Sequence, residues 1–126
     1  MKKYLLICLI CSLLFVGCSK TASPISLPKA GDIDNVNVSF EGKKIYHSDK
    51  SWINDVVSKM GDAKPTRKES VQDVPKVDNY IKVDFKVKKE NFTVFAYEEK
   101  GKYYIERPYQ GIYEIDDNLY QKLQQK

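Results

Sequence analysis

Three cysteines and one histidine are the side chains of this sequence best suited to nucleophilic or metal chemistry. Cys8 and Cys11 lie inside an apolar block, and Cys18 ends the run Phe15-Val16-Gly17-Cys18. This run resembles a lipobox, although Leu is usual at the position of Phe15. In a lipobox, small residues before the cysteine admit the processing peptidase, and the cysteine thiol becomes acylated. We therefore expect lipid on Cys18, and no free thiol, disulfide or thiolate site in the folded domain.

The residues before Cys18 have the pattern of a cleaved secretory signal. Lys2 and Lys3 precede about a dozen apolar residues, fewer than the roughly 20 that span a hydrocarbon core. Cleavage would leave residues 18–126 on the extracytoplasmic face of the cell membrane, because a diacylated cysteine anchors a protein stably. The alternative is an ordinary secretory signal, or an uncleaved anchor, with Cys18 incidental.

The composition of the remaining chain excludes several classes of function. Loss of Lys2 and Lys3 lowers the basic residues from 21 to 19 against 17 acidic ones, so the formal net charge falls from +4 to +2. A nucleic-acid-binding domain would show a concentrated basic face, and we expect no such partner. Zinc needs three or four suitable ligands, and the sequence has a single histidine. We therefore expect His47 to be a surface or cap residue and expect no metal site. No cofactor is expected.

A tyrosine-rich stretch is the feature best suited to recognition. Residues 103–113 read YYIERPYQGIY, with four tyrosines around a Pro/Gly turn. Tyrosine gives a large, rigid contact area with a polar tip, but it is also a good strand residue. Strand alternation would direct Tyr104 and Glu106 outward. Gly111 would take a positive φ in a type II turn over residues 109–112.

A long polar segment, residues 62–79, precedes the main run of predicted strands. Connections of this length are unusual in compact domains and are often functional or mobile. If residues 64–75 fold back over the sheet, they reach the tyrosine-rich turn. We then predict one binding surface, made by Tyr104, Tyr109, Gln110 and Arg67. The alternative is a structural turn in which Tyr109 packs under the loop.

Alternating apolar residues predict strands at 35–40 and 81–88, and apolar residues on both faces predict a central strand at 92–97. Short strands are expected at 103–107 and 112–115, with 44–47 as a candidate for another. Trp52, Ile53, Val56, Val57 and Met60 form the apolar stripe of a predicted helix. These elements predict an α+β fold: an antiparallel meander of four to five strands with this helix packed on one face, Trp52 buried between them, and a short C-terminal helix. Residues 18–35 are expected to form a flexible tether and residues 36–126 a single domain.

Two segments, 66–75 (TRKESVQDVP) and 106–113 (ERPYQGIY), carry a resemblance to a known family. The chain resembles a domain-of-unknown-function family of small lipoproteins from Gram-positive Firmicutes, over roughly residues 25–124. The resemblance implies a membrane-anchored extracytoplasmic domain and supplies no catalytic residues.

Three functions remain open for the tethered domain. The first is a non-enzymatic binding or interaction module with a protein or cell-wall partner, favoured because no phosphate loop, nucleophile elbow or similar catalytic motif is present. The second is an inhibitor or immunity-type lipoprotein that blocks a protein partner. The third is a cell-wall hydrolase using carboxylates such as Asp73, Asp84 or Glu106, in which a retaining pair would lie about 5–5.5 Å apart.

Overall fold

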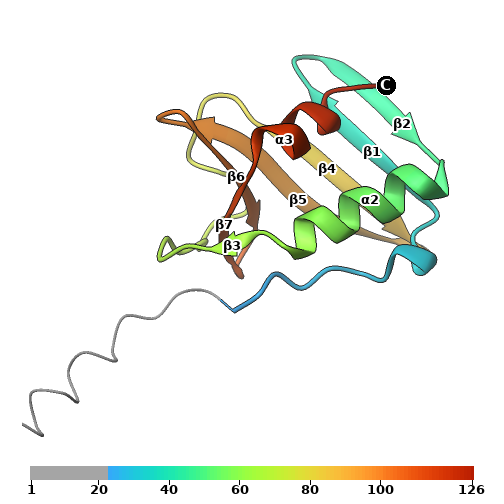
Figure 1. The fold of residues 1–126 in the computed structure, drawn as a ribbon, viewed down its shortest axis with the longest axis horizontal. Coiled ribbons are helices and arrows are strands. Elements are labelled where there is room, and N and C mark those ends of the chain that lie inside the picture. Colours follow the sequence, from blue (N-terminus) through green and yellow to red (C-terminus); the bar gives the residue numbers. More distant parts are fainter. Residues whose placement is uncertain (1–22) are drawn as a thin grey trace, which may run out of the picture.

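The computed structural model describes residues 23–126 and shows an α+β fold built on one open antiparallel sheet (Figure 1). The strand order is β2-β1-β4-β5-β6-β7-β3. The strands are β1 (Asn35–Phe40), β2 (Lys43–His47), β3 (Lys64–Pro65), β4 (Ile81–Val87), β5 (Glu90–Glu99), β6 (Lys102–Arg107) and β7 (Gly111–Ile115). Two α-helices, α2 (Lys50–Gly61) and α3 (Asp117–Leu123), and a 3-10 turn, η1 (Ala30–Asp32), complete the fold. The predicted signal peptide and Cys18 lie outside the described residues.

The α+β class and the antiparallel pairing are confirmed, whereas four to five strands are too few: the sheet has seven. Strands β4 to β7 form the predicted meander, and the β1–β2 hairpin adds to it through β1 and β4. β3 pairs Lys64 with Glu114 and Pro65 with Tyr113 of β7. Two residues carry no periodicity, so the sequence pattern gives no indication of this strand.

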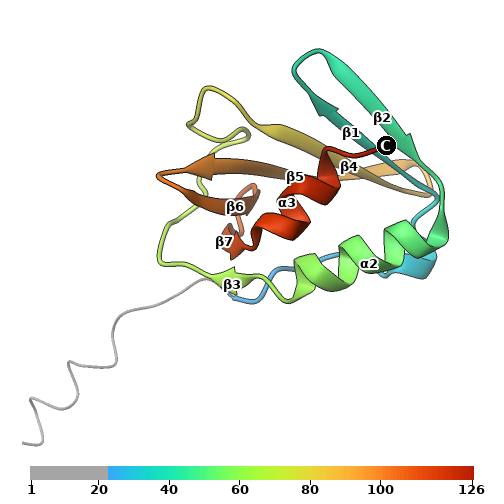
Figure 2. The same ribbon diagram turned by 45° about the horizontal axis from the view of Figure 1, so that its top comes forward.

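The helices lie together on one face of the sheet (Figure 2). Asp49 caps α2 by accepting a hydrogen bond from the Ser51 amide, and Asp116 caps α3 by accepting one from the Leu119 amide. A cap of this kind satisfies an amide that has no partner inside the helix. The apolar stripe of α2 is buried at Ile53, Val56 and Met60, as predicted. Among the described residues, no helix is long and apolar enough to cross a membrane.

Trp52 differs from its prediction, because it is only partly buried. It lies near the start of α2, where its ring stacks on His47 of β2 with the centroids 3.6 Å apart and the planes within 4°. The stack joins the helix to an edge strand, not to the centre of the sheet.

The segment before β1 belongs to the packed domain, although it was expected to be a tether as far as residue 35. Ile33 is completely buried, and Ile25, Leu27 and Ala30 pack against the same core. The Tyr113 hydroxyl on β7 also donates to the Ser23 carbonyl at 2.6 Å. The composition of this stretch suggests flexibility, but its few apolar side chains bury enough surface to hold it in place.

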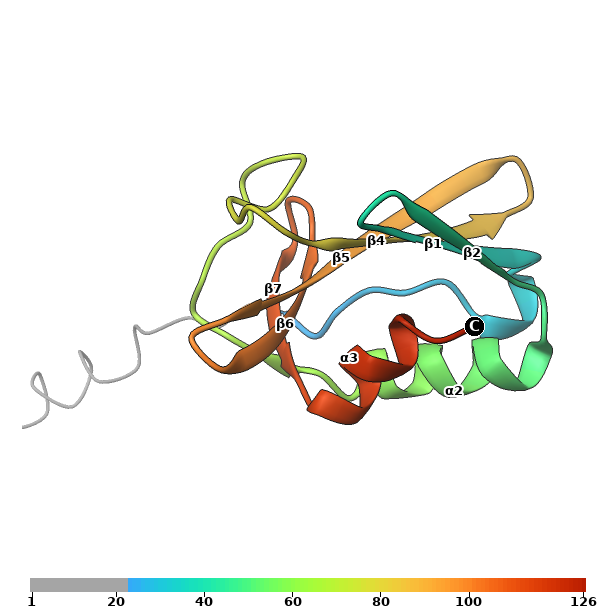
Figure 3. The same ribbon diagram turned by 90° about the horizontal axis from the view of Figure 1, so that it is seen from above.

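The long connection between β3 and β4 covers the other face of the sheet. We call residues 66–80 the outer loop; it stands opposite α2 and α3 (Figure 3). A second, smaller apolar cluster lies beneath it, in which Val77 and Tyr80 pack against Tyr97, Tyr104 and Ile112. The outer loop thus folds back over the sheet, which is the condition on which the predicted binding surface depends.

Candidate functional site

The outer loop is fixed to the sheet at its beginning by Thr66. Its amide and its hydroxyl both donate to the Ile112 carbonyl on β7, at 3.0 and 2.7 Å. The same hydroxyl accepts a hydrogen bond from the Lys68 amide. These bonds continue the β3–β7 pairing by one residue and direct the chain onto the outer face.

Glu106 holds the middle of the outer loop. It lies on β6, is only 1% exposed, and faces the loop because its neighbour Ile105 faces the main core. One carboxylate oxygen accepts hydrogen bonds from the Ser70 hydroxyl at 2.8 Å and from the Gln72 amide nitrogen at 2.9 Å. The other accepts from the Tyr97 hydroxyl at 3.3 Å. A buried carboxylate is costly unless several donors compensate it, so this cluster ties two loop residues to two strands.

Tyr97 is suited to remain a donor in this cluster. Burial raises the pKa of its hydroxyl far above the ordinary value for tyrosine, and the neighbouring negative charge of Glu106 raises it further. Both effects disfavour a phenolate. The hydroxyl therefore stays protonated under ordinary conditions.

The turn between β6 and β7, residues 108–110, meets the outer loop. The Tyr109 hydroxyl donates to an Asp73 oxygen at 2.7 Å, and the Tyr109 amide donates to the Ser70 hydroxyl at 3.2 Å. The pKa of the Tyr109 hydroxyl is raised, mainly by this hydrogen bond to Asp73. The predicted meeting of loop and turn is therefore present.

The turn itself is displaced from the predicted position. The Gln110 amide donates to the Arg107 carbonyl at 3.0 Å, which closes a turn over residues 107–110. Tyr109 occupies its third position with φ +63°, whereas Gly111 is already part of β7, paired with Arg107. A non-glycine residue in this region costs free energy and marks a place where the surrounding contacts impose the backbone conformation.

The four residues predicted to form the binding surface have different environments. Tyr109 is 66% exposed, and Arg67 is also exposed, near the start of the outer loop. Tyr104 is only 8% exposed, so its predicted place on the surface is wrong. It does face outward from the sheet, but the outer loop covers it, and the Lys68 ammonium lies 4.8 Å from the centre of its ring.

The side chain of Gln110 is bound to other residues of the domain and is not free to contact a partner. Its side-chain oxygen accepts from the Ser26 amide at 3.1 Å, and its nitrogen donates to the Pro24 carbonyl at 3.2 Å. Together with the bond from Tyr113 to Ser23, these contacts hold the first described residues beside the turn.

Two valines that the sequence analysis did not single out complete the exposed surface. Val71 and Val74 of the outer loop are 64% and 44% exposed. Each is one residue away from a loop side chain that contacts Tyr109. We call Val71, Val74 and Tyr109 the loop–turn patch. They are three of the four large apolar side chains exposed among residues 23–126, the other being Tyr46. The only signal in the sequence is the presence of valines in a polar segment without strand or helix periodicity.

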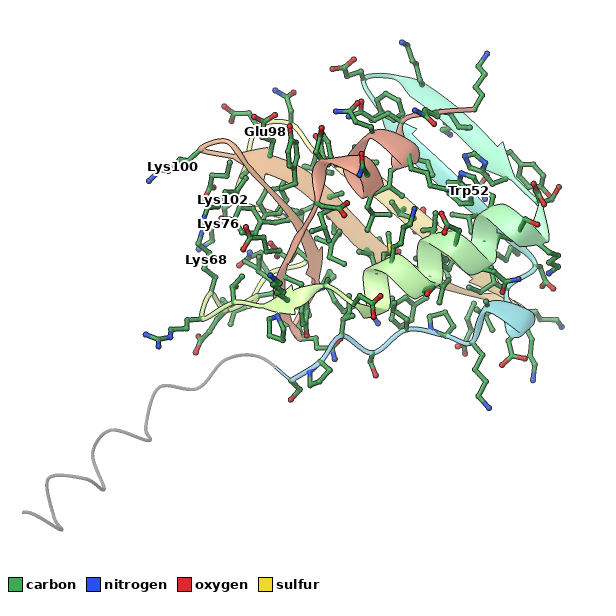
Figure 4. The ribbon with its side chains drawn as sticks, in the orientation of Figure 1. Trp52, Lys68, Lys76, Glu98, Lys100 and Lys102 are labelled. Carbon is green, nitrogen blue, oxygen red and sulfur yellow. The ribbon has the colours of Figure 1, made fainter. Side chains whose placement is uncertain are left out.

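A small cavity of about 220 Å³ opens beside the patch. Tyr97 and Glu106 lie among its lining residues, together with Lys68, Lys76 and Glu99. Lys68 is paired with Glu99 at 3.0 Å. Figure 4 shows Lys68 and Lys76 along the same edge of the molecule as Lys100 and Lys102 at the β5–β6 turn.

Two of the carboxylates considered for hydrolysis, Asp84 and Glu106, lie too far apart on the sheet to act as a pair. Asp84 is paired in register with Thr93, and Glu106 with Phe95, so the two acids lie on one face but two strands apart. Strand spacing and rise place their backbones about 12 Å from each other. Asp84 accepts from the Thr93 hydroxyl, whereas Glu106 is engaged by the outer loop. Within the described part of the chain, no group of three or more His, Cys, Asp or Glu is placed to hold a metal ion.

Comparisons with known proteins assign this chain to a family. An NMR structure of a protein from Ruminococcus gnavus is 35% identical to this chain and superposes with a TM-score of 0.67, over 77% of this chain and 99% of the other. A search of curated proteins found no match. The family model DUF5301, described as a domain of unknown function (DUF5300), matches residues 21–114. The chain therefore belongs to the DUF5301 family of domains of unknown function.

Proposed function

We propose that this protein is a membrane-anchored extracytoplasmic lipoprotein whose domain is a non-enzymatic binding module, with the loop–turn patch as its recognition surface. The observation that carries the proposal is that three of the four large apolar side chains exposed among residues 23–126, those of Val71, Val74 and Tyr109, lie on the outer loop and on the turn bound to it. Exposed apolar groups with polar and charged neighbours are typical of interaction sites. Anchoring through Cys18 is proposed from the lipobox and the signal pattern alone.

The rigidity of the patch supports the same role. Ser70 and Gln72 are bound to the buried Glu106, while Tyr109 is bound to Ser70 and Asp73. A surface that is already ordered loses little conformational freedom when it binds. An inhibitor or immunity-type lipoprotein is a special case of this function in which the bound partner is blocked. The carboxylates give the hydrolase alternative no comparable support, since Glu106 is engaged in holding the loop.

Tyr109 and Tyr46 provide an internal comparison for testing this function, because they are 66% and 63% exposed. Tyr46 lies on β2, at the opposite edge of the sheet from β3. We expect nitration of the two tyrosines in native cell envelopes to give a lower Tyr109-to-Tyr46 ratio than in the purified protein, because the partner covers Tyr109. The readout is peptide mass spectrometry. An equal ratio in both preparations would contradict a covered patch.

A matched pair of variants links protection to the patch. We expect V71S/V74S to restore the reactivity of Tyr109 in envelopes, whereas substitution of Lys43 and Lys44 on β2 by Ser leaves the protection unchanged. All four side chains are exposed, so the free energy of unfolding should change by no more than about 0.5 kcal/mol.

A further inference from the structure

The position of the first described residues limits how far the patch can lie from a lipid on Cys18. Ser23 and Pro24 are bound to Tyr113 and Gln110, beside the β6–β7 turn. Five residue steps separate Cys18 from Ser23, and a fully extended chain covers at most about 18 Å over five steps. A domain of roughly 100 residues has a radius of gyration of about 13 Å, so this reach is less than the domain's own width. If Cys18 carries the proposed lipid, the end of the sheet that bears β3, β7 and the turn is therefore the end held next to the membrane.

The chemistry of this end suits a lipid surface. The loop–turn patch contains Tyr109, and tyrosine is enriched at the interface between a membrane and water. The surrounding stretch, residues 64–76, has four basic side chains and two acidic ones. Lys68 is paired with Glu99 of β5, and Asp73 accepts a hydrogen bond from the Tyr109 hydroxyl, so four basic and three acidic side chains, Glu99 included, leave a net charge of +1. Basic side chains close to a bilayer are attracted to anionic phospholipids, and apolar ones partition into the interface.

The size of the patch also favours lipid over a protein partner. A stable protein complex buries about 800 Å² on each partner, usually around a central group of large anchors. Three partly exposed side chains provide much less apolar area than this. A lipid surface needs no complementary shape. The acyl anchor also keeps the domain close to the membrane, so docking costs little further translational entropy.

We propose that the loop–turn patch and the basic side chains around it dock on the anionic phospholipid surface to which the protein is anchored. This inference rests on the proposed function, since it names the partner of the same patch. Docking holds the domain in one orientation, with β3 and β7 at the membrane and β2 directed away from it. The outer loop is then a membrane-contacting element.

The test uses the mature lipidated protein in nanodiscs of phosphatidylglycerol or phosphatidylcholine, each containing a little lipid with a spin-labelled headgroup. With phosphatidylglycerol, we expect NMR signals of residues 67–76 and 108–110 to broaden most, and those of β2 least. With phosphatidylcholine, the difference between the two regions should shrink. Uniform broadening in both lipids would overturn docking.

Charge-reversal variants give a matched control. Each basic charge near an anionic surface is worth about fivefold in partitioning, so R67E, which changes two charge units, should weaken docking about 30-fold and abolish the selective broadening. K44E makes the same change on β2 and should leave it intact. Equal effects of R67E and K44E would contradict docking through the outer loop.

The two proposals fail differently. If Tyr109 is protected in native envelopes but not in phosphatidylglycerol nanodiscs, the patch is a binding surface with a partner other than lipid, and the docking inference is wrong. If Tyr109 is unprotected in both, the proposed function falls as well.

Discussion

At the scale of single residues, His47 combines burial with an unsatisfied polar atom. It is 7% exposed, its ring stacks on Trp52, and its Nε2 atom has no hydrogen-bond partner among the described residues. Burial lowers the pKa of His47, and a contact with the backbone of Gln125 opposes this in part. The folded protein therefore favours the neutral ring.

This environment predicts a pH-dependent stability. The unfolded chain, with an ordinary histidine pKa near 6.5, takes up a proton before the folded chain does. The free energy of unfolding should therefore fall as the pH drops below about 6.5. The contribution of His47 to this fall should end once the pH is below the pKa of His47 in the folded protein. H47F keeps an aromatic ring against Trp52 but cannot titrate.

Urea denaturation between pH 7.5 and 5 checks this prediction. We expect the wild-type protein to lose more stability over that range than H47F, and His47 is the only histidine in the sequence. Parallel pH profiles for the two proteins would show that His47 does not contribute.

At the scale of elements, the segment from Ser23 to β1 and the outer loop close the two faces of the sheet. The first completes the core on the helix side through Ile33, and the second covers Tyr104 on the other side. Both lack periodicity, so local sequence patterns give them no element type. Their role depends on contacts with strands more than 30 residues away, such as Ser70 with Glu106.

Ile33 offers a direct test of the packed N-terminal segment. I33A should lower the free energy of unfolding by about 2–5 kcal/mol, because a completely buried large aliphatic side chain is replaced by a small one. K29A, in the same segment but exposed, should change it by no more than about 0.5 kcal/mol. Chemical denaturation measures both. A small loss for I33A would restore the interpretation of this segment as a flexible tether.

The strands other than β3, together with α2, could be predicted because their patterns are local. Ile81, Val83 and Phe85 alternate with exposed or half-buried residues, and Ile53, Val56 and Met60 repeat at helical spacing. The length of the polar segment marks it as a candidate functional loop, but that it folds back to meet the turn could only be assumed, because this depends on the contacts of Glu106 and Tyr109. The burial of Tyr104 could not be predicted, because alternation tells which face a side chain takes but not what covers that face.

At the scale of the whole molecule, the attachment proposed at Cys18 would determine where the domain works. Mass spectrometry of the mature protein should find an N-terminal Cys18 carrying the mass of a diacylglyceryl group. C18S should lack this modification and be processed differently, because the acylated thiol is absent. An unmodified Cys18 in the wild-type protein would contradict the lipoprotein proposal and remove the reach argument for docking.

The two edge strands of the open sheet gain importance if Cys18 anchors the protein as proposed, because the copies are then confined to two dimensions and their sheet edges can meet. Exposed strand edges can pair with those of neighbours and start aggregation. Here one edge is β3, which is only two residues long and includes Pro65, a residue without an amide hydrogen to donate. The other edge, β2, begins with exposed Lys43 and Lys44, which repel the same strand of another copy. The chain can therefore reach high surface density without joining edge to edge.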